Sequence, residues 1–458
     1  MREVVFALQD TLKLLIESKK YATLRDILIT MQPADVAVLF EEVEEEKLPL
    51  LFRLLPKEQA ADTFVEMDSD LQEMLIRGFS DHELKEIVDE LYVDDAVDIV
   101  EEMPANVVKR ILKQADPEKR KMINEILNYP EDSAGSIMTT EYVSLRPSMT
   151  AEEAIKRIRR TGVDKETIYT CYVTQHDRVL IGYLTLKTLL LADDEAEIRD
   201  IMGQDIISVT TTDDQEEVAR TLSKYDLSAV PVVDKEQRLV GIVTIDDAID
   251  VIEEEATRDM EMMAASTPSD KSYMKTGVFE TWKNRIPWLV ILMISATFTS
   301  IVLNSFEERL ITCSVLIAYI PMLMGTGGNS GSQSSVAVIR AISLGEISFV
   351  DTFRVFWKEI RVSVLCGVVL AGANFLKLLL VDRMLLGNTE VTFMIALVIS
   401  VTMACVVICA KTIGCLMPLL ADKLKLDPAL MASPFITTIV DVLSLLVYIV
   451  WATVFLGI

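Results

Sequence analysis

The sequence predicts a multidomain membrane protein with four parts: an all-α superhelical N-terminal domain, an α/β domain made of two copies of one unit, a connecting helix, and a transmembrane domain of five helices. Three observations predict this fold class. The formal charge of −26 lies wholly in residues 1–285, a strand-and-helix pattern recurs there at an offset of 59 residues, and five long apolar runs follow. We expect the parts to cover residues 1–130, 131–253, 254–283 and 284–458.

The N-terminal part shows helical periodicity and no convincing strand run. A short segment recurs in it, as Ala34-Asp35-Val36, Ala61-Asp62-Thr63 and Asp95-Ala96-Val97, and acidic residues follow each copy. Repeats of this kind are typical of short helices that stack on their neighbours. We therefore expect a superhelical array of helices.

The second part contains strands that alternate with helices in two copies, which open with Ile137-Met138-Thr139 and Ile201-Met202-Gly203. Equivalent positions lie 59 residues apart, and they are Val173 and Val232, Gly182 and Gly241, and Thr185 and Thr244. With these residues, the segment 137–253 resembles a tandem pair of CBS domains. The resemblance implies two similar α/β units packed together.

CBS pairs often bind adenine nucleotides through a hydroxyl group after the last strand and an Asp three residues later. Thr244 and Asp247 match that motif in the second copy. In the first copy Thr185 is followed by Lys187 and Thr188, so the acidic position is missing. The resemblance therefore implies at most one such half-site, with ATP or another adenine nucleotide as its ligand.

The acidic charge bounds the class of ligand. Ten of the 70 acidic and ten of the 44 basic residues follow position 285, which leaves 60 acidic against 34 basic residues before it. This excess argues against nucleic acid as a partner and favours cations, although an acidic surface also serves solubility. The histidines, His82 and His176, are far apart and the cysteines have no CxxC spacing, so a metal here should be a hard, oxygen-bound one.

The five apolar runs are each long enough to cross about 30 Å of hydrocarbon and contact membrane lipid, and they cover 286–303, 310–339, 362–381, 391–421 and 428–458. Lys and Arg are more frequent in the segments before the first run and in the loops after the second and fourth runs. The positive-inside rule then predicts a multi-pass protein of the cell (inner) membrane with a cytoplasmic N-terminus and an extracytoplasmic C-terminus.

The second run carries a polar, glycine-rich segment from Gly325 to Ser335, including Gly328 and Asn329. Pro321 and the glycines should loosen this helix and free backbone carbonyls, which is tolerated only next to protein or water. Small residues also allow helices to approach closely. A pore lining and tight packing without a pore therefore both remain open for this segment.

Asp441 is a lone carboxylate in the middle of the fifth run, and Thr437 and Thr438 lie on the same helical face. A charged group at this depth costs at least ~2.5 kcal/mol and is functional by default. A cation pathway that includes Ser433 is the first hypothesis. The alternative is an ion pair with Lys411, the only cation at comparable depth.

The chain combines a helical acidic domain, a repeated α/β unit, an acidic connecting helix and five apolar runs. It also contains Gly325-Thr-Gly-Gly-Asn-Ser-Gly-Ser-Gln333 and the segment from Asp427 to Asp441. With these features it resembles the MgtE family of magnesium channels. The resemblance covers essentially the whole chain. It implies a homodimer whose pore lies between the second and fifth spans of both subunits, with the two copies of Asp441 facing each other. A carboxylate pair can hold Mg²⁺ through its hydration shell.

The resemblance and the acidic charge together predict how the pore is gated. Two carboxylates ~4 Å apart repel by roughly 4 kcal/mol at an effective dielectric constant of about 20, and a bound Mg²⁺ removes that repulsion. High cytoplasmic Mg²⁺ should therefore compact the soluble parts and the connecting (plug) helix and close the pore to Mg²⁺ uptake. The candidate regulatory ligands, chosen by position, are Asp94, Asp95, Asp98, Glu216, Asp226, Asp246, Asp247, Asp250, Glu254, Glu255 and Asp259.

Two other function classes remain open. A cation-coupled divalent metal carrier would use Asp441 as a titrating site, and a membrane-anchored sensor would signal through the CBS pair and conduct nothing. An enzyme is not expected, because the sequence shows no nucleophile–base pair, P-loop or histidine metal motif.

Overall fold

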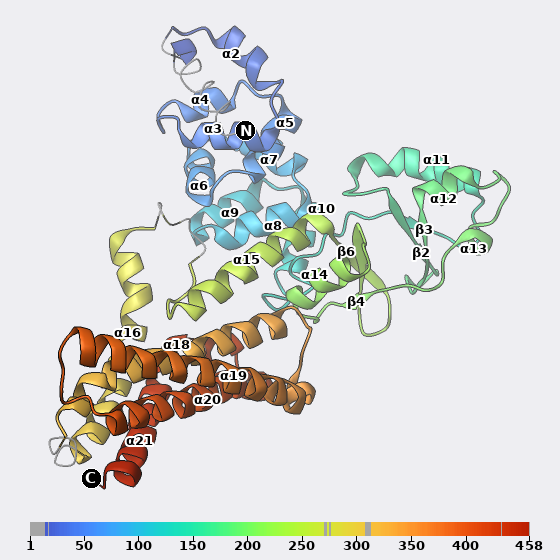
Figure 1. Ribbon diagram of the computed structural model, residues 1–458. Helices are drawn as coiled ribbons and strands as arrows, with labels where there is room; N and C mark the ends of the chain where they lie inside the picture. Colours follow the sequence, from blue (N-terminus) through green and yellow to red (C-terminus); the bar gives the residue numbers. More distant parts are fainter. Residues whose placement is uncertain are drawn as a thin grey trace. The chain divides into compact units, whose positions relative to one another are not determined.

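The computed structural model (Figure 1) describes residues 14–16, 18–269, 273, 276–306, 313–431 and 433–457. The chain divides into two compact units, Met1–Ile252 and Glu253–Ile458. The first unit contains the helical domain and the repeated α/β domain. The second contains most of the connecting helix and the long apolar helices.

The first unit begins with short helices joined by tight turns, which confirms the predicted all-helical domain. These are α2 (Tyr21–Leu28), α3 (Pro33–Glu41), α4 (Leu48–Phe52), α5 (Lys57–Val65), α6 (Ser69–Gly78), α7 (Asp81–Glu90), α8 (Val93–Glu102), α9 (Ala105–Gln114) and α10 (Pro117–Ile126). Their starts follow local chemistry: Ser80 and Glu83 form a capping box at α7, and Asp116 caps α10.

Alternate helices of this domain pack on one another. Helix α3 packs on α5, α5 on α7, α7 on α9, and α8 on α10, which is the arrangement of a stacked array. Four phenylalanines form the centre of the core, with ring centroids 5.3–6.5 Å apart in the contacting pairs; they are Phe40, Phe52, Phe64 and Phe79. Phe52 contacts the other three rings.

The α/β domain contains two three-stranded sheets of identical topology. The first sheet is formed by β1 (Ser144–Leu145), β2 (Thr170–Thr174) and β3 (Leu180–Thr185), and the second by β4 (Val209–Thr210), β5 (Ala229–Val233) and β6 (Leu239–Thr244). In each sheet the first pair is parallel and the second antiparallel. Val173 pairs with Gly182 and Val232 with Gly241, so the 59-residue repeat sets the same register twice.

The two sheets are linked by an exchange of their opening segments. A Cβ atom at Gly241 would lie 2.6 Å from Sδ of Met138, and one at Gly182 would lie 2.5 Å from Sδ of Met202. Each methionine opens one copy and packs on the glycine of the other. The helices of this domain are α11 (Ala151–Thr161), η1 (Gly162–Asp164), α12 (Leu186–Leu191), α13 (Ile198–Ile201) and α14 (Gln215–Lys224).

Helix α15 (Ile245–Met263) follows β6 directly and continues into the second unit. It differs from the connecting helix expected over 254–283, because it starts earlier and ends sooner. The backbone at Ala265 has φ of 53°, and Pro268 follows, so the chain leaves the helical conformation here. The described residues 264–269 are not helical.

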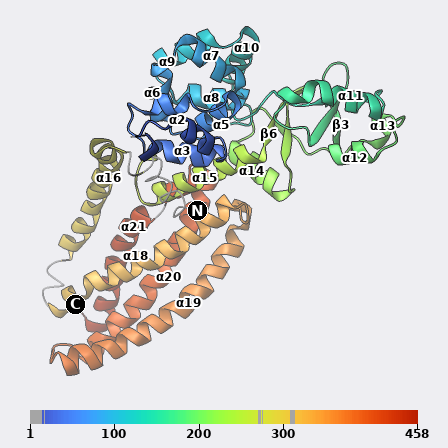
Figure 2. The ribbon, with the colours of Figure 1, turned by 90° about the horizontal axis from the view of Figure 1, so that it is seen from above.

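The second unit contains long helices, of which α18, α19 and α20 run alongside one another in both views (Figures 1 and 2). They are α16 (Val278–Ser305), α18 (Val315–Ser343), η2 (Phe349–Asp351), α19 (Thr352–Lys377), the π-helix η3 (Leu378–Leu385), α20 (Phe393–Lys423), η4 (Pro428–Met431) and α21 (Ser433–Leu456). Helices α18 and α19 both pack on α20, and α18 also packs on α21.

Four helices among the described residues are long and apolar enough to cross a membrane, and they lie within Val278–Ser305, Phe349–Leu385, Phe393–Lys423 and Pro428–Leu456. They correspond to four of the five expected spans. The remaining expected span is the second in chain order and corresponds to α18. This helix is as long as the others, but its glycine and hydroxyl residues lower its hydropathy, so it is not among the four.

Helix α18 is continuous through Pro321 and the glycine-rich segment, so the expected loosening of this helix is not observed. Three of its glycines, Gly327, Gly328 and Gly331, pack closely instead. A Cβ atom at Gly328 would lie 2.9 Å from Cγ2 of Thr437, and one at Gly331 would lie 2.9 Å from Cγ2 of Ile436. The small residues let α21 approach α18, and the helix keeps its own hydrogen bonds.

Candidate metal sites

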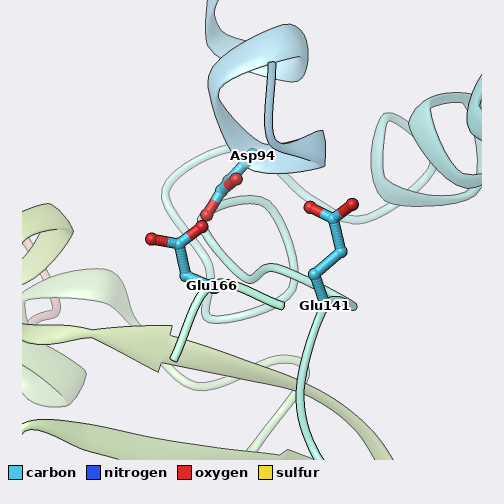
Figure 3. A group of neighbouring side chains, drawn as sticks. All are labelled: Asp94, Glu141 and Glu166. Carbon is cyan, nitrogen blue, oxygen red and sulfur yellow. The ribbon is translucent and has the colours of Figure 1, made fainter. Parts of the chain in front are cut away.

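Three carboxylates of the first unit form a group whose ligand atoms all lie within 4.8 Å of one another: Asp94, Glu141 and Glu166 (Figure 3). Asp94 and Glu166 point toward each other, and Glu141 approaches the pair from a neighbouring loop. Asp94 belongs to the first turn of α8, whereas the two glutamates belong to loops of the first α/β copy. The group therefore joins the helical domain to the α/β domain.

Backbone hydrogen bonds hold the group in place. No side chain of the preceding residue caps α8, and the Val93 N–H donates to Oε2 of Glu141 at 3.0 Å. A carboxylate is favoured at this position, because it lies at the positive end of the helix dipole. The Glu166 N–H donates to the Glu141 carbonyl oxygen at 2.9 Å, which places the second glutamate beside the first.

Two oxygens of this group are buried without a hydrogen-bond partner among the described residues, Oδ1 of Asp94 and Oε2 of Glu166. The Asp94 side chain is only 6% exposed. Burial, together with the carboxylates of Asp247 and Asp95, raises the pKa of Asp94 well above its usual range, and burial raises the pKa of Glu166 to about 8. A buried carboxylate without a donor is unfavourable unless it is protonated or binds a cation.

Other acidic residues surround the group. Burial is the main cause that raises the pKa of Asp95 to about 6 and of Asp247 to about 7. Burial and the carboxylate of Asp247 also raise the pKa of Asp98. The Asp98 side chain keeps solvent access, so screening by water weakens its repulsion from Asp247. Lys119 and Lys165 both act on the carboxylate of Glu141, and the Lys119 ammonium group donates to the carbonyls of Asp89 and Leu91.

The donor set fits a hard divalent cation. Two ligand oxygens on opposite sides of a Mg²⁺ ion are about 4.2 Å apart, at Mg–O distances of about 2.1 Å. Atoms within 4.8 Å of one another reach that geometry after a small inward shift or with a water molecule between ligand and ion. The unpartnered oxygens of Asp94 and Glu166 are the ones that such an ion would engage.

The expected regulatory residues divide into two groups. Asp94, Asp95, Asp98, Asp246 and Asp247 lie close enough to raise one another's pKa or that of Glu166. Of the others, Glu216 pairs with Arg220 on α14, Asp226 and Asp250 are exposed, and Glu254, Glu255 and Asp259 belong to the second unit.

Sequence reasoning missed Glu141 and Glu166. No local spacing relates these two residues to Asp94, because the three come from segments far apart in the chain. Their only signal is an acidic residue in a loop, which is common in this chain.

The residues of the nucleotide motif contact each other. Oδ2 of Asp247 accepts hydrogen bonds from the Thr244 hydroxyl at 2.5 Å and from the Thr244 N–H at 3.3 Å. In the first copy, Thr185 bonds to Thr188 instead of to a carboxylate. The asymmetry expected from the sequence is therefore present at both strand ends.

The expected pore residues lie on two packed helices. Asp441 is half-buried on α21, and the hydroxyls of Thr437 and Thr438 donate to the Pro434 carbonyl at 2.8 and 3.1 Å. On α18, Gly328 is buried against Thr437, whereas Gly325 and Asn329 are exposed. Helix α21 begins at Ser433, but the side chain of this residue lies outside the described part of the structure.

Lys411 does not contact Asp441. Its ammonium group donates to the Ser334 hydroxyl at 3.3 Å, and no hydrogen bond or ion pair joins it to Asp441 in the part of the chain that the structure describes. The alternative in which these two charges neutralise each other is therefore not what the structure shows. The burial of Asp441 has no compensating cation on a neighbouring described helix.

Comparison with known families covers most of the chain. A model described as a divalent cation transporter matches residues 320–451, one described as the MgtE intracellular N domain matches 31–132, and the CBS domain matches 134–195 and 198–254. The CBS match confirms the tandem pair expected from the 59-residue repeat.

Full-length relatives and solved structures agree with these matches. The chain is 37% identical over 430 residues to the magnesium transporter MgtE of Thermus thermophilus, with 93% of each chain covered, and 31% identical over 447 residues to that of Bacillus subtilis, with 97% and 96% covered. It also resembles the crystal structure of the cytosolic domain of the Mg²⁺ channel MgtE in complex with ATP, with a TM-score of 0.51 and 36% identity over 53% of this chain and 99% of the other. The soluble part of a magnesium transporter aligns with a TM-score of 0.51 and 31% identity, over 56% and 100% of the two chains. The chain belongs to the MgtE family of magnesium transporters.

Proposed function

We propose that this protein is a Mg²⁺-selective channel of the cell (inner) membrane that admits Mg²⁺ and closes when cytoplasmic Mg²⁺ binds its soluble domains. The acting form is a homodimer with a cytoplasmic N-terminus and an extracytoplasmic C-terminus. The observation that carries the regulatory part is the group Asp94, Glu141 and Glu166, in which two buried carboxylate oxygens have no hydrogen-bond donor among the described residues.

Magnesium bound at this group would stabilise one arrangement of the first unit. Without a cation, the carboxylates of Asp94 and Glu166 either keep a proton or repel each other across their interface. A divalent ion removes the repulsion and joins α8 to the loops of the α/β domain. Because this stabilisation exists only while both segments meet, Mg²⁺ binding favours the compact arrangement over an open one.

The uncovered face of α18 supports a second subunit. Gly325, Asn329 and Gln333 lie four residues apart on one face of the helix and are exposed in the single chain. Lipid offers these groups no hydrogen-bond partner, so water or another protein surface must cover them. A second copy of the chain around a hydrated path does both, and α18 would then be the second of five spans.

Asp441 supplies the charge of that path. A half-buried carboxylate without a cationic partner among the described residues is suited to hold Mg²⁺. Mg²⁺ releases its water reluctantly, so two such carboxylates facing each other would hold the ion through its hydration shell. The threonine hydroxyls at 437 and 438 donate to the backbone, and their oxygens remain able to accept from bound water.

Helix α15 is suited to couple the two functions. Within the second unit, the Ser343 hydroxyl of α18 donates to Oδ2 of Asp259 at 2.8 Å, and Met262 and Met263 pack on Ile339 and Ala429. The end of α15 is thus attached to the helix that carries the polar segment. A shift of α15 with the soluble domains would reach α18 directly.

An adenine nucleotide is a further proposed ligand at Thr244 and Asp247. A related cytosolic domain was solved in complex with ATP. In this chain the two residues lie at the end of β6 and the start of α15. A nucleotide bound there would contact Asp247, whose carboxylate also raises the pKa of Asp94 in the metal group.

The test is Mg²⁺ flux into liposomes that contain the purified full-length protein, at low and high Mg²⁺ on the side of the soluble domains. Asp441→Ala should abolish flux. The double variant Asp94→Asn with Glu166→Gln should conduct but require several-fold more Mg²⁺ for inhibition, because it lacks two ligand charges. The double variant Asp205→Asn with Glu195→Gln, at two exposed acidic residues, is the control for the same change in net charge.

Normal flux in Asp441→Ala would refute the pore assignment. Inhibition of the double variant at the wild-type Mg²⁺ concentration would refute the regulatory assignment. Single-channel current recordings distinguish the channel from a cation-coupled carrier, because the transport rate of a carrier is far too low to give a measurable unitary current.

A further inference from the structure

Three polar residues on three different helices form a connected chain inside the second unit. The Lys411 ammonium group of α20 donates to Oγ of Ser334 on α18 at 3.3 Å, and that hydroxyl donates to Oε2 of Glu359 on α19 at 2.7 Å. The donor and acceptor directions are consistent, because the hydroxyl receives one hydrogen bond and gives the other. Neither the proposed pore nor the proposed regulatory site uses these residues.

Burial makes this chain of contacts costly to break. Lys411 is 6% exposed and Ser334 is 2% exposed, while Glu359 is half-buried. An ammonium group inside a membrane-spanning helix needs a nearby anion and hydrogen-bond acceptors. The serine hydroxyl provides an acceptor, and Glu359 behind it provides the negative charge. Removing the charge of Glu359 leaves the buried Lys411 ammonium group without its counter-charge, and removing Lys411 leaves a half-buried carboxylate without one.

Other close contacts of α18 lie at the same level of the helix. Gly331, one turn before Ser334, lies against Gly414 of α20. The hydroxyl of Ser335, the residue after Ser334, donates a hydrogen bond to the Met431 carbonyl of η4 at 3.0 Å. Helix α18 is therefore attached to α19, α20 and η4 within two turns, through residues at positions i, i+3 and i+4 that lie on one face of the helix.

We propose that Lys411, Ser334 and Glu359 are positioning residues for Mg²⁺ transport, which hold α18 at one rotation about its axis and so direct its uncovered face toward the ion path. They act through α18 and do not touch the ion. This inference rests on the proposed function, in which the face of Gly325, Asn329 and Gln333 lines that path.

The experiment compares full-length variants in liposomes, with flux normalised to monodisperse protein and measured over a range of external Mg²⁺. The variants are Lys411→Met, Glu359→Gln, Ser334→Ala, Lys411→Arg and the double variant of the first two. Ser334→Ala removes one hydroxyl and no charge, so it tests the relay even if the charge variants fail to fold. Lys358→Met, an exposed lysine next to Glu359 in sequence, is the matched control.

We expect Lys411→Met, Glu359→Gln and Ser334→Ala each to lower the maximal flux by roughly fivefold or more, while the Mg²⁺ concentration for half-maximal flux changes by less than about twofold. Lys411→Arg should keep more than about half of the flux, because it retains the charge and the donor. The maximal flux of the double variant should be no lower than that of the less active of the two single variants, because the effects of residues that act as one unit are not additive.

Three results would overturn the proposal. These are normal maximal flux in Ser334→Ala, a shift of the half-maximal concentration in place of the maximal flux, and losses in the double variant that equal the product of the single losses. Asp441→Ala is measured in parallel. If it conducts normally, the proposed function fails; if it is inactive while Ser334→Ala is normal, only the positioning role fails.

Discussion

The contact between α18 and α20 predicts that Gly414→Ala weakens the second unit. An added Cβ atom would lie 3.0 Å from the carbonyl carbon and 3.2 Å from the Cα atom of Gly331, and closer still to the Gly331 carbonyl oxygen. Carbon atoms normally pack about 3.5–4.0 Å apart. Because the opposing atoms are backbone atoms, no side-chain rotation relieves the clash, and the two helices must separate.

The magnitude follows from two opposing effects. Replacing glycine by alanine inside a helix stabilises it by about 1 kcal/mol. Overpacking against a rigid neighbour costs about 1–3 kcal/mol, and more when backbone must move. Because only backbone atoms oppose the new Cβ atom, the cost lies in the upper part of that range, at about 2–3 kcal/mol, and we expect a net loss of about 1–2 kcal/mol. For a unit of this size that corresponds to a melting temperature lower by about 2–8 °C.

The assay is thermal unfolding of the purified full-length chain in detergent, with Mg²⁺ flux as a second measurement. Gly372→Ala is the matched control, because a Cβ atom at Gly372 of α19 meets nothing within 4 Å. The control should melt at or above the wild-type temperature. If Gly414→Ala melts as high as Gly372→Ala, the close approach of α18 and α20 is not as the structure has it.

Three further predictions concern the first unit. Burial raises the pKa of Asp95 to about 6, of Asp247 to about 7 and of Glu166 to about 8. Such carboxyls stabilise the fold fully below their unfolded pKa and lose this stabilisation as the pH rises through the folded pKa. In the absence of Mg²⁺, the melting temperature of the soluble domains in the full chain should fall as the pH rises from about 5 to about 8.5. Excess Mg²⁺ should reduce this fall. A melting temperature that rises over the same pH range without Mg²⁺ would contradict the burial of these carboxyls. Phe52→Ala removes a ring that is 3% exposed and contacts three other rings, so it should cost about 3–5 kcal/mol in urea unfolding, and a loss below about 1 kcal/mol would mean that the ring is not in the core. Thr244→Ala should weaken ATP binding, measured by calorimetry, by tenfold or so if its hydroxyl holds phosphate or ribose, whereas Thr185→Ala in the first copy should leave ATP binding unchanged, and equal losses would contradict a single half-site.

The repeated α/β domain was predictable in detail because its information is periodic. Val173 and Val232 occupy the same register positions, opposite Gly182 and Gly241, as the 59-residue offset requires. The apolar runs were predictable for a similar reason, since hydropathy alone distinguishes a span. Helix α18 is the exception, because its small and hydroxyl residues lower its hydropathy while its glycines pack against α20 and α21.

The polar segment of α18 shows why one pattern can support two interpretations. The sequence left pore lining and tight packing both open. In the structure, Gly328 and Gly331 pack on α21, whereas Gly325 and Asn329 are exposed. Both interpretations therefore apply, to different faces of the same helix. Only the positions of the neighbouring helices decide which of these closely spaced residues are packed against α21 and which are exposed.

The sequence by itself determined the order of the parts, the class of each fold and the family. These depend on local periodicity, hydropathy, charge and repeated motifs, which a chain carries along its length. The tertiary structure alone decided that Asp94 meets Glu141 and Glu166, and that Lys411 bonds to Ser334 and not to Asp441. Such contacts join segments far apart in the chain, and no local pattern encodes which distant charge a buried residue will face.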